Sequence, residues 1–190
     1  MSCTMGDGET ARTGSRMKEA LYVNKAFLLD RDGTINVDTG YVGDPEQVEL
    51  LPGAAEAIRN MNKAGFLVIV VSNQSGVARG YFGLDAVKRV NDRINELLAR
   101  QGAHVDAFYV CPHLKGGAVK EFDVECQCRK PRLGLFQKAI ADFSLDPAQC
   151  YACGDRPRDV ERLTELGIPP EHLAIADGVT MAECFPFLSD

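Results

Sequence analysis

The sequence has no apolar run that approaches the roughly 20 residues a helix needs to cross a bilayer. It also lacks the apolar stretch of a signal peptide near its start, any internal repeat and any low-complexity segment. Positive charge is in the minority, with 21 Lys and Arg against 27 Asp and Glu and a formal net charge of −6. These absences disfavour a membrane protein and a protein with a basic groove for nucleic acid. We therefore expect a monomeric, cytoplasmic protein with neither a membrane nor a nucleic-acid partner.

The cysteines do not form the pattern of a disulfide framework. Their number is odd, and no export signal places the chain in an oxidising compartment. The seven positions are Cys3, Cys111, Cys126, Cys128, Cys150, Cys153 and Cys184. Three of them lie close to a histidine in the sequence, which favours a metal site over disulfides.

The length and composition suit one soluble domain. The chain has 190 residues, 45% of them hydrophobic and 25% charged. The first two dozen residues lack a pattern of their own. We expect residues 1–24 to be a flexible N-terminal extension and residues 25–190 to be the folded domain.

Short apolar runs alternate with amphipathic stretches, which is typical of an α/β fold. The run FLVIVV at 66–71 is apolar throughout, as expected for a strand buried on both faces of a parallel sheet. The predicted strands are 25–30, 66–71, 105–110, 151–154 and 172–176. The predicted helices are 52–65, 84–101, 133–143 and a helix with Val160, Leu163 and Leu166 that ends at Gly167. The sequence therefore predicts a doubly wound parallel sheet, while the stretch after 176 gives no clear pattern.

Polar residues follow the predicted strands at 30–34, 72–76 and 154–159. In doubly wound sheets, ligands bind beyond the carboxyl ends of the strands, where the strand order reverses. We therefore expect the active site at the edge of the sheet formed by the carboxyl ends of the strands.

Asp30 and Asp32 directly follow the first predicted strand, and Gly33 allows a sharp turn after them. Two neighbouring carboxylates repel each other, so they suit a divalent cation or a shared proton. With magnesium present, one can attack phosphorus, while the other protonates the leaving oxygen and then activates water. Two solvated aspartates in a turn are the simpler interpretation of this pair alone.

Three further groups have the chemistry of a phosphate site. The loop Ser72, Asn73, Gln74 and Ser75 offers uncharged donors for phosphate oxygens. Lys130 supplies a point charge, and the preceding Arg129 offers a planar fork for another anionic part of a substrate. Asp155 can complete a magnesium site, and Asp159 can orient its neighbours. Each group alone also fits an ordinary loop, turn or helix start.

The order of the four groups, DRDGT, SNQ, RKP and GD, resembles the haloacid dehalogenase (HAD) superfamily of phosphotransferases over about residues 25–176. The resemblance implies Asp30 as nucleophile and Asp32 as general acid and base. It implies Ser72 and Lys130 as phosphate stabilisers. It further implies Mg²⁺ held by Asp30, Asp155 and the backbone carbonyl of Asp32.

The segment before Arg129 has a C-x-H…C-x-C spacing. Three thiolates and one imidazole suit tetrahedral zinc, and four protein ligands indicate a structural rather than a catalytic ion. The predicted ligands are Cys111, His113, Cys126 and Cys128. Zinc would fix a long loop that has no secondary structure of its own and that leads directly into Arg129 and Lys130.

The zinc loop narrows the resemblance to the capless, zinc-containing HAD phosphatases. The segments DRDGTINVDTGYV, NQSGVARGYF and CPHLKGGAVKEFDVECQCRKP are similar to those of the heptose 1,7-bisphosphate 7-phosphatases. That likeness implies a small phosphorylated metabolite as substrate and no large cap domain. It also implies a substrate site lined by Asp38, Thr39, Gly40, Tyr41, Ser72, Asn73, Gln74 and Ser75, with Arg129 in recognition.

Alternatives stay open at this point. Arg156 after the GD aspartate and the run Leu166, Gly167 and Ile168 favour a histidinol-phosphate phosphatase. A polynucleotide 3′-phosphatase shares the DxDGT and TNQ-like groups, although the acidic charge disfavours it. An alternative of another class is an inactive binding module stabilised by zinc.

Overall fold

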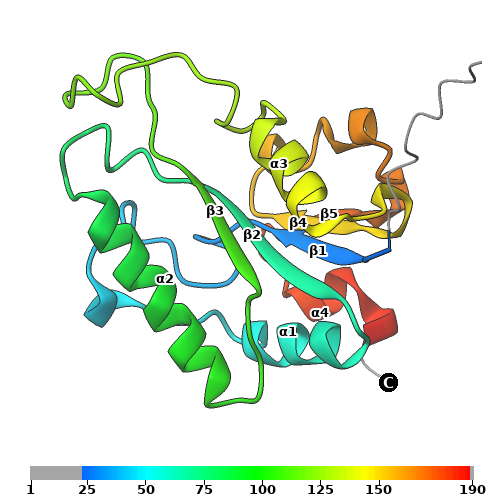
Figure 1. Ribbon diagram of the computed structural model, residues 1–190. Coiled ribbons are helices and arrows are strands. Elements are labelled where there is room, and N and C mark those ends of the chain that lie inside the picture. The colour runs from blue at the N-terminus through cyan, green and yellow to red at the C-terminus, as the bar shows by residue number, and fades with distance from the viewer. Residues whose placement is uncertain (1–22, 189–190) are drawn as a thin grey trace, which may run out of the picture.

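The structure, a computed structural model, describes residues 23–188 (Figure 1). Most of the predicted extension, residues 1–22, lies outside the described residues. Five parallel strands form one sheet in the order β3-β2-β1-β4-β5. They are β1 (Ala26–Leu29), β2 (Leu67–Asn73), β3 (Ala107–Cys111), β4 (Tyr151–Gly154) and β5 (Leu173–Ile175). The α/β fold with a doubly wound sheet is confirmed.

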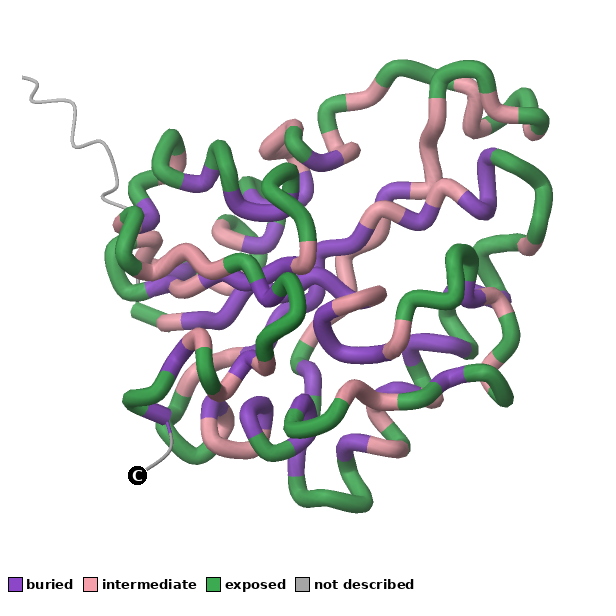
Figure 2. The backbone as a smooth tube through the Cα atoms, turned by 180° about the vertical axis from the view of Figure 1, so that it is seen from behind, coloured by how far each residue is buried: buried purple, intermediate pink, exposed green. Residues whose placement is uncertain are grey.

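Helices cover both faces of the sheet because the strands are apolar on both faces (Figures 1 and 2). Side chains alternate along a strand, so Phe27 and Leu29 pack toward α1 (Ala54–Lys63), α2 (Leu84–Ala99) and α4 (Met181–Cys184). Ala26 and Leu28 pack on the other side, toward α3 (Gly134–Phe143). The same alternation decides which way the residues just after β1 point.

The helices begin and end close to the predicted positions. They are α1 (Ala54–Lys63), α2 (Leu84–Ala99), α3 (Gly134–Phe143) and a short α4 (Met181–Cys184). Gly65 follows α1 with a φ of +77°, in the left-handed region that favours glycine. The predicted helix face of α2 is buried at Val87, Val90, Ile94 and Leu98, whereas Leu84 is exposed. None of the helices among residues 23–188 is long and apolar enough to span a membrane.

The predicted helix before Gly167 is wrong as an α-helix. The segment forms two 3₁₀ turns, η3 (Pro157–Asp159) and η4 (Leu163–Leu166). The Asp159 side chain accepts the Arg156 N–H at 3.0 Å and pairs with Lys130. These contacts hold the first turn against the sheet edge, and the backbone at Val160 leaves the helical region with a φ of −131°. Gly167 does end η4, with a φ of +92°.

The chain after β5 packs back on the first layer of helices. α4 and η6 (Pro186–Leu188) lie against α1. Phe185 is buried with its ring centroid 5.0 Å from that of Phe27, and Tyr151 stacks on Phe27 at the same distance. The C-terminal segment thus completes the core under β1 and β4.

The remaining connections contain no further α-helix or strand among the described residues. The stretch between β1 and α1 contains only η1 (Pro45–Gln47), and η2 (Pro147–Gln149) and η5 (Pro170–His172) precede β4 and β5. Within residues 23–188 nothing covers the sheet edge as a separate cap domain. The edge beyond the carboxyl ends of the strands is therefore open.

Candidate active site

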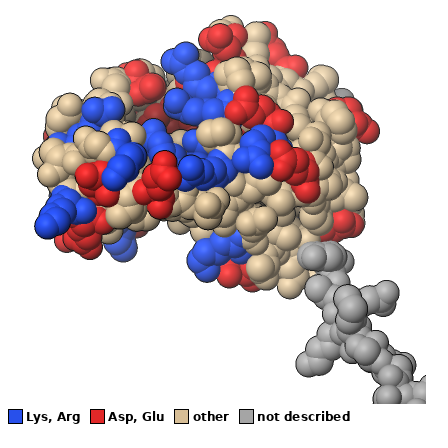
Figure 3. Space-filling model, turned by 90° about the horizontal axis from the view of Figure 1, so that it is seen from above, with Lys and Arg blue, Asp and Glu red and all other residues tan. Residues whose placement is uncertain are grey.

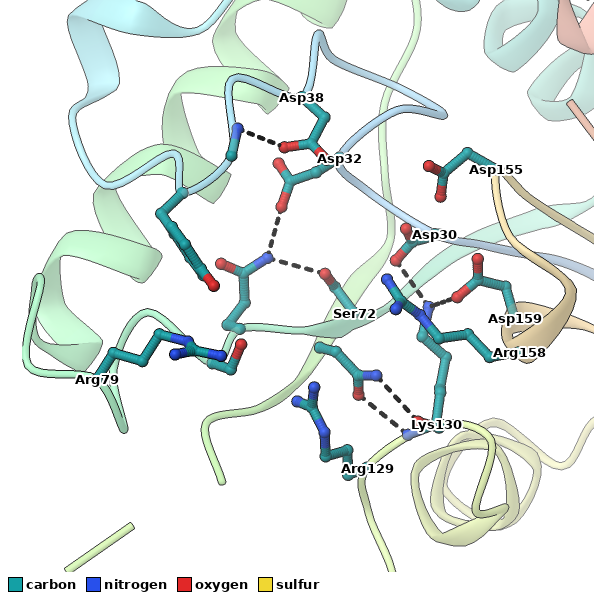
Figure 4. Close-up of a pocket in the computed structure, with 15 residues that line it drawn as sticks. Asp30, Asp32, Asp38, Ser72, Arg79, Arg129, Lys130, Asp155, Arg158 and Asp159 are labelled. Atoms are coloured by element: carbon teal, nitrogen blue, oxygen red, sulfur yellow. Dashed lines mark hydrogen bonds and ion pairs between the residues drawn. The ribbon is translucent and has the colours of Figure 1, made fainter. Parts of the chain in front are cut away.

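A pocket of about 370 Å³ opens at the carboxyl ends of the strands (Figures 3 and 4). β1 connects to β2 on one side and lies beside β4 on the other, so the strand order reverses there. Every predicted catalytic, substrate and magnesium residue except Thr39 lines the pocket. The lining residues are Asp30, Asp32, Asp38, Gly40, Tyr41, Ser72, Asn73, Gln74, Ser75, Arg79, Arg129, Lys130, Asp155, Arg158 and Asp159.

A buried lysine lies between two carboxylates at the base of the pocket. Lys130 Nζ is 2.7 Å from Asp30 Oδ1 and 2.7 Å from Asp159 Oδ1, and it donates to the Val71 carbonyl at 2.6 Å. Its side chain is only 1% exposed. The ammonium thus donates hydrogen bonds to Asp30 and to the Val71 carbonyl, and it forms an ion pair with Asp159. This geometry fixes the charge next to Asp30.

Burial perturbs the Asp30 carboxyl group. It raises the pKa of Asp30 to about 6, against the opposing effect of the Lys130 ammonium and with a further increase from the Asp159 carboxylate. The charged form is disfavoured because the protein replaces water around it. A divalent cation would offset that cost.

Asp155 lies close enough to Asp30 to share a cation. One carboxylate oxygen each from Asp30, Asp155 and Asp159 lies within 4.8 Å of the others. Burial, followed by the Asp159 carboxylate, raises the pKa of Asp155. Gly33 allows this approach, because a Cβ at that residue would lie 2.8 Å from Asp155 Oδ2. Three carboxylates against one buried ammonium have the chemistry of a Mg²⁺ site.

The SNQ loop holds the site together through its amides. Asn73 accepts the Lys130 N–H at 3.0 Å and donates to the Lys130 carbonyl at 3.1 Å. Gln74 Nε2 donates to Ser72 Oγ at 2.9 Å and to Asp32 Oδ2 at 2.8 Å. These amides position the catalytic candidates as well as line the pocket.

Two loops meet at the mouth of the pocket. Asp38 accepts the Gly40 N–H at 2.8 Å, and the Tyr41 ring lies 4.9 Å from the Tyr81 ring, edge to face. The Arg79 guanidinium lies 5.6 Å above the Tyr41 ring. Thr39 is exposed and is not among the residues that line the pocket, and its part in substrate binding stays a prediction. Gly40 N–H binds the Asp38 side chain in a tight turn, and Thr39 lies at the tip of this turn.

The four predicted zinc ligands come together in one cluster. Their ligand atoms lie within 4.8 Å of one another. His113 Nδ1 is 3.2 Å from Cys128 Sγ, which is 3.1 Å from Cys111 Sγ, and Cys126 Sγ is 3.6 Å from Cys111 Sγ. Burial raises the pKa of the Cys111 and Cys128 thiols. Thiols this close cannot all ionise without a cation, so the cluster fits a tetrahedral metal ion.

The cluster is tied to the pocket through the backbone. Arg129 Nη1 donates to the His113 carbonyl at 3.3 Å, and Val119 N–H donates to the Ala78 carbonyl at 2.9 Å. The loop therefore rests on the segment after the SNQ loop at one end and delivers Arg129 at the other.

Comparison with known proteins agrees with this site. The family model described as polynucleotide kinase 3 phosphatase matches residues 29–164. The chain belongs to this phosphatase family. The D-glycero-β-D-manno-heptose-1,7-bisphosphate 7-phosphatase of Haemophilus influenzae is 39% identical over 139 residues, 73% of this chain and 75% of the relative.

Two solved structures extend the comparison. An HAD-like phosphatase from Mesorhizobium loti is 35% identical with a TM-score of 0.77, covering 87% of this chain and 85% of that one. The D,D-heptose 1,7-bisphosphate phosphatase from B. bronchiseptica, complexed with magnesium and phosphate, is 28% identical with a TM-score of 0.71. That match covers 88% of this chain and 99% of the other. The HAD resemblance and the phosphoric monoester hydrolase class are confirmed.

Sequence reasoning missed two residues of this phosphatase. Arg158 lines the pocket, and its guanidinium points inward beside Asp30 (Figure 4). The sequence did not indicate that Arg158 enters the pocket, because the 3₁₀ turn at Pro157–Asp159, rather than the predicted helix, sets the direction of its side chain. Arg31 is wholly buried behind Asp32. The sequence could have indicated this position, because side chains alternate along a strand and Arg31, between Asp30 and Asp32, would point away from the face of Asp30.

Proposed function

We propose that this protein removes the 7-phosphate of D-glycero-D-manno-heptose 1,7-bisphosphate through a phospho-aspartate on Asp30. The observation that carries the proposal is the position of Asp30. It lines an open pocket at the switch point of the sheet, paired with a buried lysine and close to a second carboxylate. The names of the heptose-phosphatase relatives support the substrate.

In the first step, Asp30 attacks phosphorus, and the bond from phosphorus to the ester oxygen breaks. Asp32 donates a proton to that oxygen as it leaves. In the second step, Asp32 takes a proton from water, whose oxygen attacks the phosphorus of the phospho-aspartate. The bond from phosphorus to the Asp30 oxygen breaks, which releases inorganic phosphate and restores the Asp30 carboxylate. Lys130 and the Ser72 hydroxyl stabilise the negative charge on the phosphoryl oxygens.

We assign Mg²⁺ to Asp30, Asp155 and the backbone carbonyl of Asp32. When bound, Mg²⁺ neutralises part of the repulsion between the attacking carboxylate and the phosphate. Asp159 has one oxygen on Lys130 and the other on the Arg156 N–H. We therefore assign Asp159 to holding Lys130 rather than to the metal.

We assign structural Zn²⁺ to Cys111, His113, Cys126 and Cys128. Its role would be to fix the loop that delivers Arg129 and Lys130 to the pocket. The carbonyl of one ligand residue, His113, accepts from the Arg129 guanidinium. Loss of the ion is therefore expected to disturb recognition as well as stability.

Recognition of a bisphosphate requires a second cationic region. The guanidinium groups of Arg79, Arg129 and Arg158 point into the pocket from three sides (Figure 4). Figure 3 shows Lys and Arg side chains gathered across the middle of this face. Planar guanidinium groups suit a second phosphate, whereas the amine of histidinol phosphate finds only Asp38 at the mouth. A monomeric state and a cytoplasmic location stay predictions.

The test is phosphate release with Mg²⁺ from heptose 1,7-bisphosphate, histidinol phosphate and a 3′-phosphorylated oligonucleotide, compared as kcat/KM. We expect a preference of at least about a hundredfold for the heptose, about 2.7 kcal/mol in transition-state binding. The variant Asp30→Asn should lose turnover and keep its circular dichroism spectrum. A preference for either other substrate, or turnover by Asp30→Asn near the wild-type rate, would contradict the proposal.

A further inference from the structure

Arg31 is a wholly buried charge beside the proposed catalytic pair. It follows Asp30, and strand alternation turns its side chain toward α2 while Asp30 faces Lys130. Its exposed fraction is 0%. Arginine is almost never fully buried unless it is paired, because removing its charge from water is costly. Its partners therefore indicate what it does.

Four residues hold the Arg31 guanidinium through five acceptor atoms. Nε donates to Asp32 Oδ1 at 3.0 Å and Nη2 to Asp32 Oδ2 at 2.9 Å, which is a bidentate pair. Nη1 donates to Asn91 Oδ1 on α2 at 3.0 Å. Nη2 also donates to Gln74 Oε1 at 3.0 Å and to the Val42 carbonyl at 3.4 Å. The fork is thus fixed from α2 and from two loops.

The Asp32 carboxylate receives two more donors. Asn36 Nδ2 donates to Oδ1 at 2.9 Å, and Gln74 Nε2 donates to Oδ2 at 2.8 Å. With the bidentate Arg31, these fill the roughly four acceptor positions of a carboxylate. Of the three partners, Gln74 lines the pocket together with Asp32, whereas Arg31 and Asn36 do not. The Oδ2 position under Gln74 is therefore the one that faces a substrate.

We infer that Arg31 is a positioning residue, whose buried guanidinium holds the Asp32 carboxylate from behind with its Oδ2 toward the leaving oxygen. In the free protein Gln74 Nε2 donates to that Oδ2. In the first step Oδ2 carries a proton in place of this donor and passes it to the ester oxygen as the bond from phosphorus to that oxygen breaks. The inference rests on the proposed acid–base role of Asp32. A purely structural role of Arg31 would affect every substrate, whereas a role in positioning Asp32 affects the step in which the leaving oxygen takes a proton.

The test compares two substrates with Arg31→Lys, which keeps the positive charge but loses the planar fork. Heptose bisphosphate has an alkoxide leaving group that needs a proton, whereas p-nitrophenyl phosphate has a leaving group that departs without one. Since kcat/KM reports the first irreversible step, it isolates transfer to Asp30. We expect kcat/KM to fall on the order of a hundredfold with the heptose and only a few-fold with p-nitrophenyl phosphate.

Two further variants separate the outcomes. Asp32→Asn should show the same dependence on leaving group, and adding Arg31→Lys to it should cost little more, because both act through one carboxylate. Absence of that dependence in Asp32→Asn would overturn the proposed function rather than the role of Arg31. Equal losses on both substrates in folded Arg31→Lys, or no loss, would overturn the role of Arg31 alone.

If Arg31→Lys does not fold, Asn91→Ala decides the question. It removes the acceptor of Arg31 Nη1 on α2 and leaves every donor to Asp32 in place. We expect a smaller loss that is again confined to the heptose substrate. Unchanged rates on both substrates, or equal losses on both, would overturn the inference.

Discussion

Replacing Lys130 with methionine removes the one ammonium that compensates two buried carboxylates. Asp30 and Asp159 are 8% and 3% exposed, and each lies 2.7 Å from Lys130 Nζ. Removing one partner of a buried ion pair costs about 3–5 kcal/mol, because the remaining charge stays buried without compensation. We expect a loss of this size in the free energy of unfolding at a pH of about 8 in Mg²⁺-free buffer.

The loss should shrink on acidification. Without Lys130, the pKa of Asp30 rises above its value of about 6, since the ammonium lowers it. A raised carboxyl pKa means that the folded state binds a proton that the unfolded state has released. The variant is therefore destabilised most above that pKa and regains stability as the pH falls through it. Every tenfold change in the acid dissociation constant is worth about 1.4 kcal/mol.

Urea denaturation at a pH of about 8 and of about 5.5 measures both effects. Lys138→Met is the matched control, because Lys138 pairs with Asp142 at 2.8 Å on the exposed surface of α3. An exposed pair of this kind contributes about 0.3–0.5 kcal/mol. The reasoning is refuted if Lys130→Met costs no more than the control, or if its cost is greater at the lower pH.

Three other predictions concern the metals and a glycine. Cys126→Ser should lower the melting temperature, and a zinc chelator should lower it in the wild type but not in the variant; equal melting with and without chelator would count against structural zinc. The apparent affinity for Mg²⁺, measured by calorimetry, should weaken as the pH falls below about 6, since protonation of Asp30 competes with the ion; a flat profile would show that Asp30 is not a ligand. Gly33→Ala should weaken Mg²⁺ binding markedly, because its Cβ would lie 2.8 Å from Asp155 Oδ2. Gly65→Ala is its control, with a φ of +77° and open space around it, and should cost only the conformational energy of about 1–2 kcal/mol without changing Mg²⁺ binding; equal effects would refute the steric argument.

Most of the fold could be predicted because the local signals agree with the tertiary arrangement. An entirely apolar run at 66–71 is typical of a strand with both faces covered, and β2 is such a strand. Gly65 and Gly167 end their segments as expected. The segment at 157–166 failed because its apolar spacing fits a helix, while a contact far away in sequence, from Asp159 to Lys130, holds it as a 3₁₀ turn.

In the candidate active site, too, some features could be predicted from local sequence and others depend on the tertiary structure. Two carboxylates directly after a strand, with a lysine and a further aspartate after later strands, predicted the pocket that the structure brings together. Ligand chemistry and spacing predicted that the four candidate zinc ligands come together, and the structure does bring them together. Zinc itself stays a proposal. The resemblance assigned Thr39 to the substrate site together with its whole loop, but each side chain in a turn has its own direction, and Thr39 is exposed outside the pocket lining. Its role in substrate binding stays a prediction.

The sequence by itself thus determined the sheet, the group of side chains that could hold zinc and the chemical class of the phosphatase, since these depend on residue type and on spacing along the chain. Only the tertiary structure decided that Asp159 holds Lys130, that Arg158 enters the pocket, and that Arg31 holds Asp32 from behind. Each of these contacts joins side chains whose direction is set by burial and by partners on other elements. A buried charge must find its counter-charge in space, and linear spacing does not record where that partner lies.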